Sequence, residues 1–118
     1  MDEQCRVVGN CADLPPGQSL LVTVDGKEVA LFNVEGRLYA IGNRCPHRSG
    51  PLVRGRVEMV SETHSSNEGP EILAVRCPIH GWLFELATGR CLTRPGAITP
   101  AFPVTCQDGE LLLGPCQG

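Results

Sequence analysis

The chain has 118 residues, of which 42% are apolar and 19% are charged, and its formal net charge at pH 7 is −3. These values are typical of an ordinary globular protein of one domain, and they exclude wholesale disorder. The small net charge, the absence of a Lys/Arg cluster and an aromatic content of only 4% argue against a nucleic-acid partner.

The first residues, MDEQCRVVG, begin with acidic side chains and lack the apolar core of a secretory signal, and no stretch is long enough to cross a bilayer. We therefore expect a cytoplasmic protein without a membrane partner. In a reducing cytosol, seven cysteines are poor evidence for disulfides, and their odd number agrees. Such cysteines are better interpreted as metal ligands or as small buried apolar residues.

The first forty residues predict a β-meander. Apolar runs at 20–24, 27–34 and 37–41 are separated by Asp25-Gly26 and Glu35-Gly36. A two-residue turn of this kind between apolar runs favours a type I′ hairpin, because both turn residues need a positive φ. This segment is therefore expected to fold into three antiparallel strands.

Two further strands are expected near the C-terminus, at 103–106 and 110–114, on either side of Gln107-Asp108-Gly109. We expect these two strands to pair with the N-terminal meander. The connector at 94–103 contains three prolines, which prevent a helix or a central strand there.

The middle of the chain, roughly 43–100, differs in character from both ends. It contains short strand candidates at 57–60, 72–76 and 83–86. The polar stretch at 61–70 has no hydrophobic periodicity, so we interpret it as an exposed hairpin loop. No long amphipathic helix is expected.

Two short motifs in this middle segment carry the chemistry. CPHRSGPL begins at Cys45 and CPIHGWLF begins at Cys77, and each motif offers one thiolate and one imidazole, from His47 and His80. Two sulfurs and two nitrogens bind either one tetrahedral zinc ion or a [2Fe–2S] cluster with the cysteines on one iron and the histidines on the other. Zinc fingers usually take two ligands from a helix, and no helix is expected here. Tight turns with inward backbone N–H groups suit bridging sulfides, so the pattern favours the cluster and leaves zinc as an alternative.

The paired motif C-x-H…C-x-x-H-G-W, within CPHRSGPL…CPIHGWLFELATGRCLTRP, resembles the Rieske cluster motif. The preceding VDGKEVALFNVEGRLYAIGNRCPH is similar to the lead-in strands of small Rieske ferredoxins and of the small subunit of NAD(P)H-dependent nitrite reductases. The resemblance covers about residues 5–115. It implies an all-β fold in a single domain, 1–118, with a Rieske-type antiparallel β-sandwich base and an inserted cluster-binding subdomain at about 43–100. It also implies one [2Fe–2S] cluster per chain, with the ligands Cys45, His47, Cys77 and His80.

Six further residues are expected around the cluster. Gly50 and Gly81 form the tight turns, and Trp82 packs under the second loop. Pro95 covers the cluster from one side, as the proline loop does in the proteins that the chain resembles. Arg48 lies near the histidine edge and meets a partner, and Arg94 is expected there too.

The remaining cysteines are expected to be packing residues or free thiols rather than ligands. They are Cys5, Cys11, Cys91, Cys106 and Cys116. The third histidine, His64, lies in the polar stretch without a neighbouring cysteine and is expected to be solvated.

Two neutral imidazoles in place of two thiolates leave an oxidised [2Fe–2S] cluster with a formal charge near zero, so its potential exceeds that of a four-cysteine ferredoxin. In the respiratory branch of the resembled family, an extra cysteine in each loop forms a disulfide and a serine donates to a sulfide. The matching positions here are Gly50, Ile79 and Trp82, which cannot do this. We therefore expect a potential toward the lower end of the Rieske range, about −150 mV or slightly above.

No general acid–base pair and no nucleophile constellation is apparent in the sequence. We expect a one-electron carrier rather than an enzyme, with a redox partner protein such as a reductase, an oxygenase or a nitrite reductase large subunit. The first hypothesis is a ferredoxin component that supplies an oxygenase. The alternatives are the small subunit of an NAD(P)H-dependent nitrite reductase and a structural zinc module.

Overall fold

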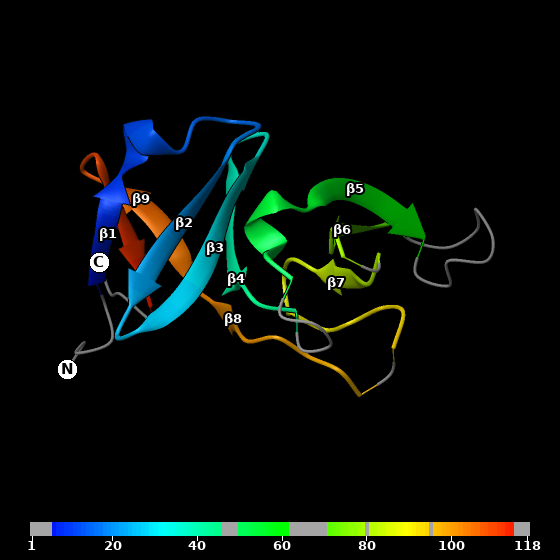
Figure 1. Cartoon of the computed structure of the whole chain (residues 1–118). Coiled ribbons are helices and arrows are strands. Elements are labelled where there is room, and N and C mark those ends of the chain that lie inside the picture. Colours follow the sequence, from blue (N-terminus) through cyan, green and yellow to red (C-terminus); the bar gives the residue numbers. More distant parts are fainter. Residues whose placement is uncertain (1–5, 46–49, 62–70, 80, 95, 115–118) are drawn as a thin grey trace.

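The computed structural model describes residues 6–45, 50–61, 71–79, 81–94 and 96–114. Within these residues the chain forms ten β-strands and two three-residue 3₁₀-helices, and the strands make three antiparallel sheets (Figure 1). Neither of these helices approaches the length that a bilayer-spanning helix requires. The expected all-β architecture is confirmed.

The central sheet contains the predicted meander. Its strands, in spatial order, are β2 (Ser19–Val24), β3 (Lys27–Val34), β4 (Arg37–Gly42) and β8 (Ala101–Phe102). Asp25 and Glu35 have φ values of 54°, and Gly26 and Gly36 have φ values of 80° and 94°. Positive φ at both turn residues is the signature of the type I′ hairpin, so both predicted hairpins are confirmed.

The C-terminal hairpin forms as predicted, but it does not pair with the meander. It consists of β9 (Val104–Gln107) and β10 (Glu110–Leu113), with positive φ at Asp108 and Gly109. β10 pairs with β1 (Arg6–Asn10) in a second sheet. The expected pairing was wrong because Leu111 and Leu113 of β10 pack in one core with residues of the meander, which stacks the two sheets instead of extending one.

Two apolar cores lie on opposite faces of the central sheet. One core joins it to the C-terminal hairpin and contains Leu14, Val29, Leu31, Ala40, Leu111 and Leu113. The other faces the middle segment and includes Ala30, Phe32, Ile41, Val75, Phe84 and Leu86. Alternate residues of β3 therefore pack in different cores, which explains why the four consecutive apolar residues 29–32 are all buried.

The third sheet belongs to the middle segment and lies beside the sandwich (Figure 1). It consists of β5 (Arg56–Ser61), β6 (Glu71–Arg76) and β7 (Leu83–Glu85), which agree with the three strand candidates to about one residue. The 3₁₀-helix η2 (Leu52–Arg54) leads into β5. Ser61 at the end of β5 pairs with Glu71 at the start of β6, so the predicted hairpin loop connects these two strands. Residues 62–70 of this loop lie outside the described residues.

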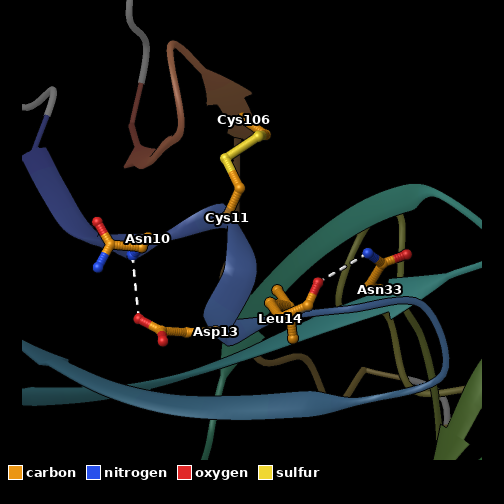
Figure 2. Close-up of a disulfide and its surroundings, with 6 residues drawn as sticks. All are labelled: Asn10, Cys11, Asp13, Leu14, Asn33 and Cys106. Carbon is orange, nitrogen blue, oxygen red and sulfur yellow. Dashed lines mark hydrogen bonds between the residues drawn. A yellow bond between two sulfur atoms is a disulfide. The ribbon is translucent and has the colours of Figure 1, made fainter.

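A disulfide corrects one prediction. Cys11, in the 3₁₀-helix η1 (Cys11–Asp13), is bonded to Cys106 of β9, with 5.8 Å between the Cα atoms (Figure 2). These two cysteines are therefore neither packing residues nor free thiols. They are 95 residues apart in the sequence, so no local sequence pattern predicts the disulfide. The β1–β10–β9 sheet brings the two cysteines together. Cys5 and Cys116 lie outside the described residues.

The disulfide has supporting contacts on both sides. The backbone N–H of Cys11 donates to the carbonyl oxygen of Gly109 at 2.9 Å. The buried Asn33 of β3 donates from Nδ2 to the carbonyl oxygen of Leu14 at 2.8 Å (Figure 2). The short segment after β1 is thus attached to the C-terminal hairpin on one side and to the meander on the other.

We predict that Cys11→Ser and Cys106→Ser lower the free energy of unfolding by the same amount, about 2–4 kcal/mol, because each releases a cross-link that closes a loop of roughly a hundred residues. Urea unfolding with and without a reductant measures this. The reductant should destabilise the wild type and leave both variants unchanged. Equal midpoints for all three proteins, with no effect of reductant, would contradict the pairing.

Candidate metal centre

The first cysteine loop leaves the central sheet at Asn43, which is only 2% exposed. Its side-chain Oδ1 accepts from the N–H of Val53 at 2.8 Å, and its Nδ2 donates to Glu28 Oε1 at 3.1 Å. Its carbonyl oxygen accepts from the N–H of Leu52 at 2.6 Å. One buried amide therefore ties both ends of the loop at 44–52 to each other and to β3.

The second cysteine loop follows β6 directly. The N–H of Cys77 donates to the carbonyl oxygen of Trp82 at 2.7 Å, and the N–H of Gly81 donates to the carbonyl oxygen of Cys77 at 3.0 Å. Gly81 has a φ of +77°, which a side chain would make costly. Glycine at this position is thus required by the turn, as the sequence indicated.

The two loops meet at Gly50. The carbonyl oxygen of Gly50 accepts from the N–H of Cys45 at 2.9 Å. A Cβ atom placed on Gly50 would lie 2.7 Å from the Sγ of Cys77 and 2.6 Å from Cγ1 of Ile79. The first loop thus reaches the sulfur of the second loop through a residue with no side chain.

Both cysteines are buried at this junction. Cys45 and Cys77 are each 2% exposed and belong to the same apolar core. Two buried sulfurs on facing turns fit the cysteine half of a site with two thiolates and two imidazoles. The histidine half, His47 and His80, lies outside the described residues, and the residues that are described contain no group of three metal-binding side chains.

An ion pair that sequence reasoning missed holds the second loop. Arg76 donates from Nε and Nη2 to the two carboxylate oxygens of Glu58, at 2.9 and 3.0 Å, and from Nη1 to the carbonyl oxygen of Gly81 at 3.2 Å. These hydrogen bonds lower the pKa of Glu58 below its usual value of 4.5, and Glu58 in turn raises the pKa of Arg76. Arg76 therefore connects β5 with both ends of the turn that begins at Cys77.

The other predicted residues are only partly described. Trp82 is half-buried and packs against the core that contains both cysteines, and the guanidinium carbon of Arg94 lies 5.3 Å from the centre of its ring. Cys91 is 4% exposed in the same core, with its Sγ 3.4 Å from Thr93 Oγ1, so its predicted role as a packing residue is confirmed. Arg48 and Pro95 lie outside the described residues.

Residues 4–103 match the Rieske [2Fe-2S] domain family, so the chain belongs to this family. It is 40% identical over 83 residues to the ferredoxin component of the naphthalene 1,2-dioxygenase system of Pseudomonas aeruginosa, a match that covers 70% of this chain and 67% of the relative. It is 33% identical over 104 residues to the 3-phenylpropionate/cinnamic acid dioxygenase ferredoxin subunit of Escherichia coli K12, covering 86% and 85% of the two chains.

Solved structures give the same fold. The ferredoxin of carbazole 1,9a-dioxygenase from Nocardioides aromaticivorans superposes with a TM-score of 0.72 at 25% identity, covering 95% of this chain and 98% of that one. A putative NADH-dependent nitrite reductase small subunit from Mycobacterium tuberculosis superposes with a TM-score of 0.77 at 26% identity, covering 97% and 96%.

The cofactor of this chain is therefore a Rieske [2Fe–2S] cluster, and the zinc alternative is set aside. The chain is a ferredoxin-type electron carrier and not a catalytic subunit. The buried pair Cys45 and Cys77 is compatible with this cofactor in both chemistry and position.

We predict that Gly50→Ala reduces the iron and acid-labile sulfide bound per chain severalfold, because the new methyl group would displace the sulfur of Cys77. Metal analysis and visible absorption measure this. Gly9→Ala is the matched control, since its Cβ would meet its nearest neighbour at an ordinary 3.6 Å. Full cluster content in Gly50→Ala would contradict the close approach of the two loops.

We also predict a pH-dependent effect of Glu58→Gln. Because the pKa of Glu58 is lowered in the folded protein, its stabilisation is complete above pH 4.5 and fades as the pH falls through the lower folded pKa. The melting temperature of the variant should lie below that of the wild type at about pH 6, and the two should converge toward about pH 3. Glu110→Gln removes the same single charge from β10 and serves as the matched control for the loss of one carboxylate.

Proposed function

We propose that this chain is the ferredoxin component of an aromatic-ring dioxygenase system and supplies single electrons to its oxygenase. We further propose that Cys45, His47, Cys77 and His80 ligate the cluster and that about 43–100 form the cluster-binding subdomain. The observation that carries the proposal is the burial of both cysteines at the meeting point of the two turns, in a chain whose relatives include dioxygenase ferredoxin components.

A Rieske cluster, when bound, takes up and releases one electron at a time. The chain's own residues hold the site and control its exposure. Val75, Phe84 and Leu52 pack around the cysteines and exclude water from the sulfur side. Ile79 of the second cysteine loop is 50% exposed, so this loop reaches the surface beside the buried sulfurs. A donor or acceptor protein would approach from this side.

A second candidate function is the small subunit of an NAD(P)H-dependent nitrite reductase. It is favoured by the superposition on the Mycobacterium tuberculosis protein, which covers nearly the whole of both chains. The two candidates differ in assembly. A ferredoxin purifies from its native cell as a separate protein, whereas a reductase subunit purifies with a much larger chain.

A cytoplasmic location remains part of the proposal. The disulfide between Cys11 and Cys106 is the observation that weighs against it, since a reducing cytosol keeps most thiols reduced.

The ligand proposal is tested with the three histidines of the chain. His47→Ala and His80→Ala should each abolish the visible absorption and the EPR signal of the reduced protein, because each removes one of four cluster ligands. His64→Ala is the matched control and should keep both signals. Retention of normal colour and reducibility by His47→Ala or His80→Ala would refute the ligand set.

A further inference from the structure

The charged side chains are divided unevenly between the two parts of the chain. Residues 43–100 contain seven of the ten Lys and Arg residues, all of them arginines, and five of the thirteen Asp and Glu residues. This segment has a net charge of +2, and the rest of the chain has −5. The net charge of the segment that carries both cysteine loops is therefore positive. The net charge of the rest of the chain, which we call the base, is negative, and so is that of the whole protein.

Several arginines lie beside the cysteine turns. Arg54 and Arg56 flank Gly55, which packs so closely against the carbonyl oxygen of Arg76 that a Cβ would not fit, and Arg76 immediately precedes Cys77. Arg94 lies over the ring of Trp82, whose carbonyl oxygen accepts from the N–H of Cys77. Other arginines of the segment are neutralised by ion pairs. These are Arg44 with Glu28, Arg76 with Glu58 and Arg90 with Glu85.

Arg54, Arg56 and Arg94 are exposed and have no ion pair within the described part of the chain. The remaining described acid of the segment, Glu71, lies at the opposite end of the β5–β6 hairpin from the Arg56–Arg76 pair. Five residues of extended strand separate these two ends, about 17 Å. Glu58 interacts electrostatically with Arg56 as well as with Arg76, so among the described residues arginines outnumber carboxylates where the hairpin meets the cysteine turns.

We propose that Arg54, Arg56 and Arg94 form a cationic rim beside the cluster loops, and that this rim docks on a redox partner whose electron-exchange site is surrounded by Asp and Glu side chains. The inference rests on the proposed function in one respect, that the electron enters and leaves at the turns of Cys45 and Cys77. Arginine suits this role because its planar guanidinium group binds a carboxylate through two parallel hydrogen bonds.

The charge of the base supports the same orientation. A partner surface rich in carboxylates repels the base, at −5, and attracts the rim, so the protein approaches with its cluster loops first. Such steering acts over roughly a Debye length, about 8 Å at physiological ionic strength, and is therefore strongest at low salt.

The experiment measures electron transfer from the reduced holoprotein to two small oxidants of opposite charge, in a stopped-flow instrument. Ferricyanide, a trianion, takes one electron and becomes ferrocyanide, and hexaammineruthenium(III), a trication, takes one electron and becomes the ruthenium(II) ion. No proton or group is transferred. The rim predicts that added salt slows the reaction with ferricyanide and speeds the reaction with the ruthenium complex, although the protein is an anion.

Arg54→Gln and Arg56→Gln should each slow the ferricyanide reaction by about twofold or more at low salt and accelerate the ruthenium reaction. Arg6→Gln removes the same single charge from β1 in the base, and it should change neither rate appreciably. Two results with a reducible cluster would overturn the cationic rim. One is a salt dependence of both rates that follows the net charge of −3, and the other is an equal effect of all three substitutions. A holoprotein without a reducible cluster would instead refute the proposed function, and the rim with it.

Discussion

The approach of Gly50 to the sulfur of Cys77 is the contact on which the site depends. The backbone of the first loop lies so close to the second loop at Gly50 that a side chain there would collide with the sulfur of Cys77. Because the same glycine accepts a hydrogen bond from Cys45, the positions of the two sulfurs are coupled through one residue. A cofactor held by both loops needs this coupling, since each loop supplies only half of the ligands that we propose.

Each loop is attached by one polar residue, the first to the central sheet and the second to the third sheet. Asn43 fastens the first loop to β3, and Arg76 fastens the second to β5. The central sheet is well suited to carry the first loop, because β3 is buried on both faces, against the C-terminal hairpin on one side and against the core with both cysteines on the other. The base thus supplies rigidity, and the loops supply the chemistry.

The features that the sequence predicted correctly are local ones. Asp25-Gly26 and Glu35-Gly36 specify their turns through backbone conformation alone, and the loops at Cys45 and Cys77 are recognisable within a few residues. The features that it did not predict depend on which strands become neighbours. The Cys11–Cys106 disulfide needs the β1–β10–β9 sheet, and the pairing of Glu58 with Arg76 needs the register of β5 and β6, in which Arg56 lies opposite Arg76.

Two thiolates and two imidazoles hold the cluster in the site that we propose. Electron–nuclear double resonance of the reduced protein labelled with ¹⁵N-histidine tests this ligand set most directly. Ligation by His47 and His80 predicts ¹⁵N couplings from two histidine nitrogens, and these are replaced by ¹⁴N couplings when unlabelled histidine is used. A cluster signal without any histidine nitrogen coupling would show a different ligand set and contradict the account.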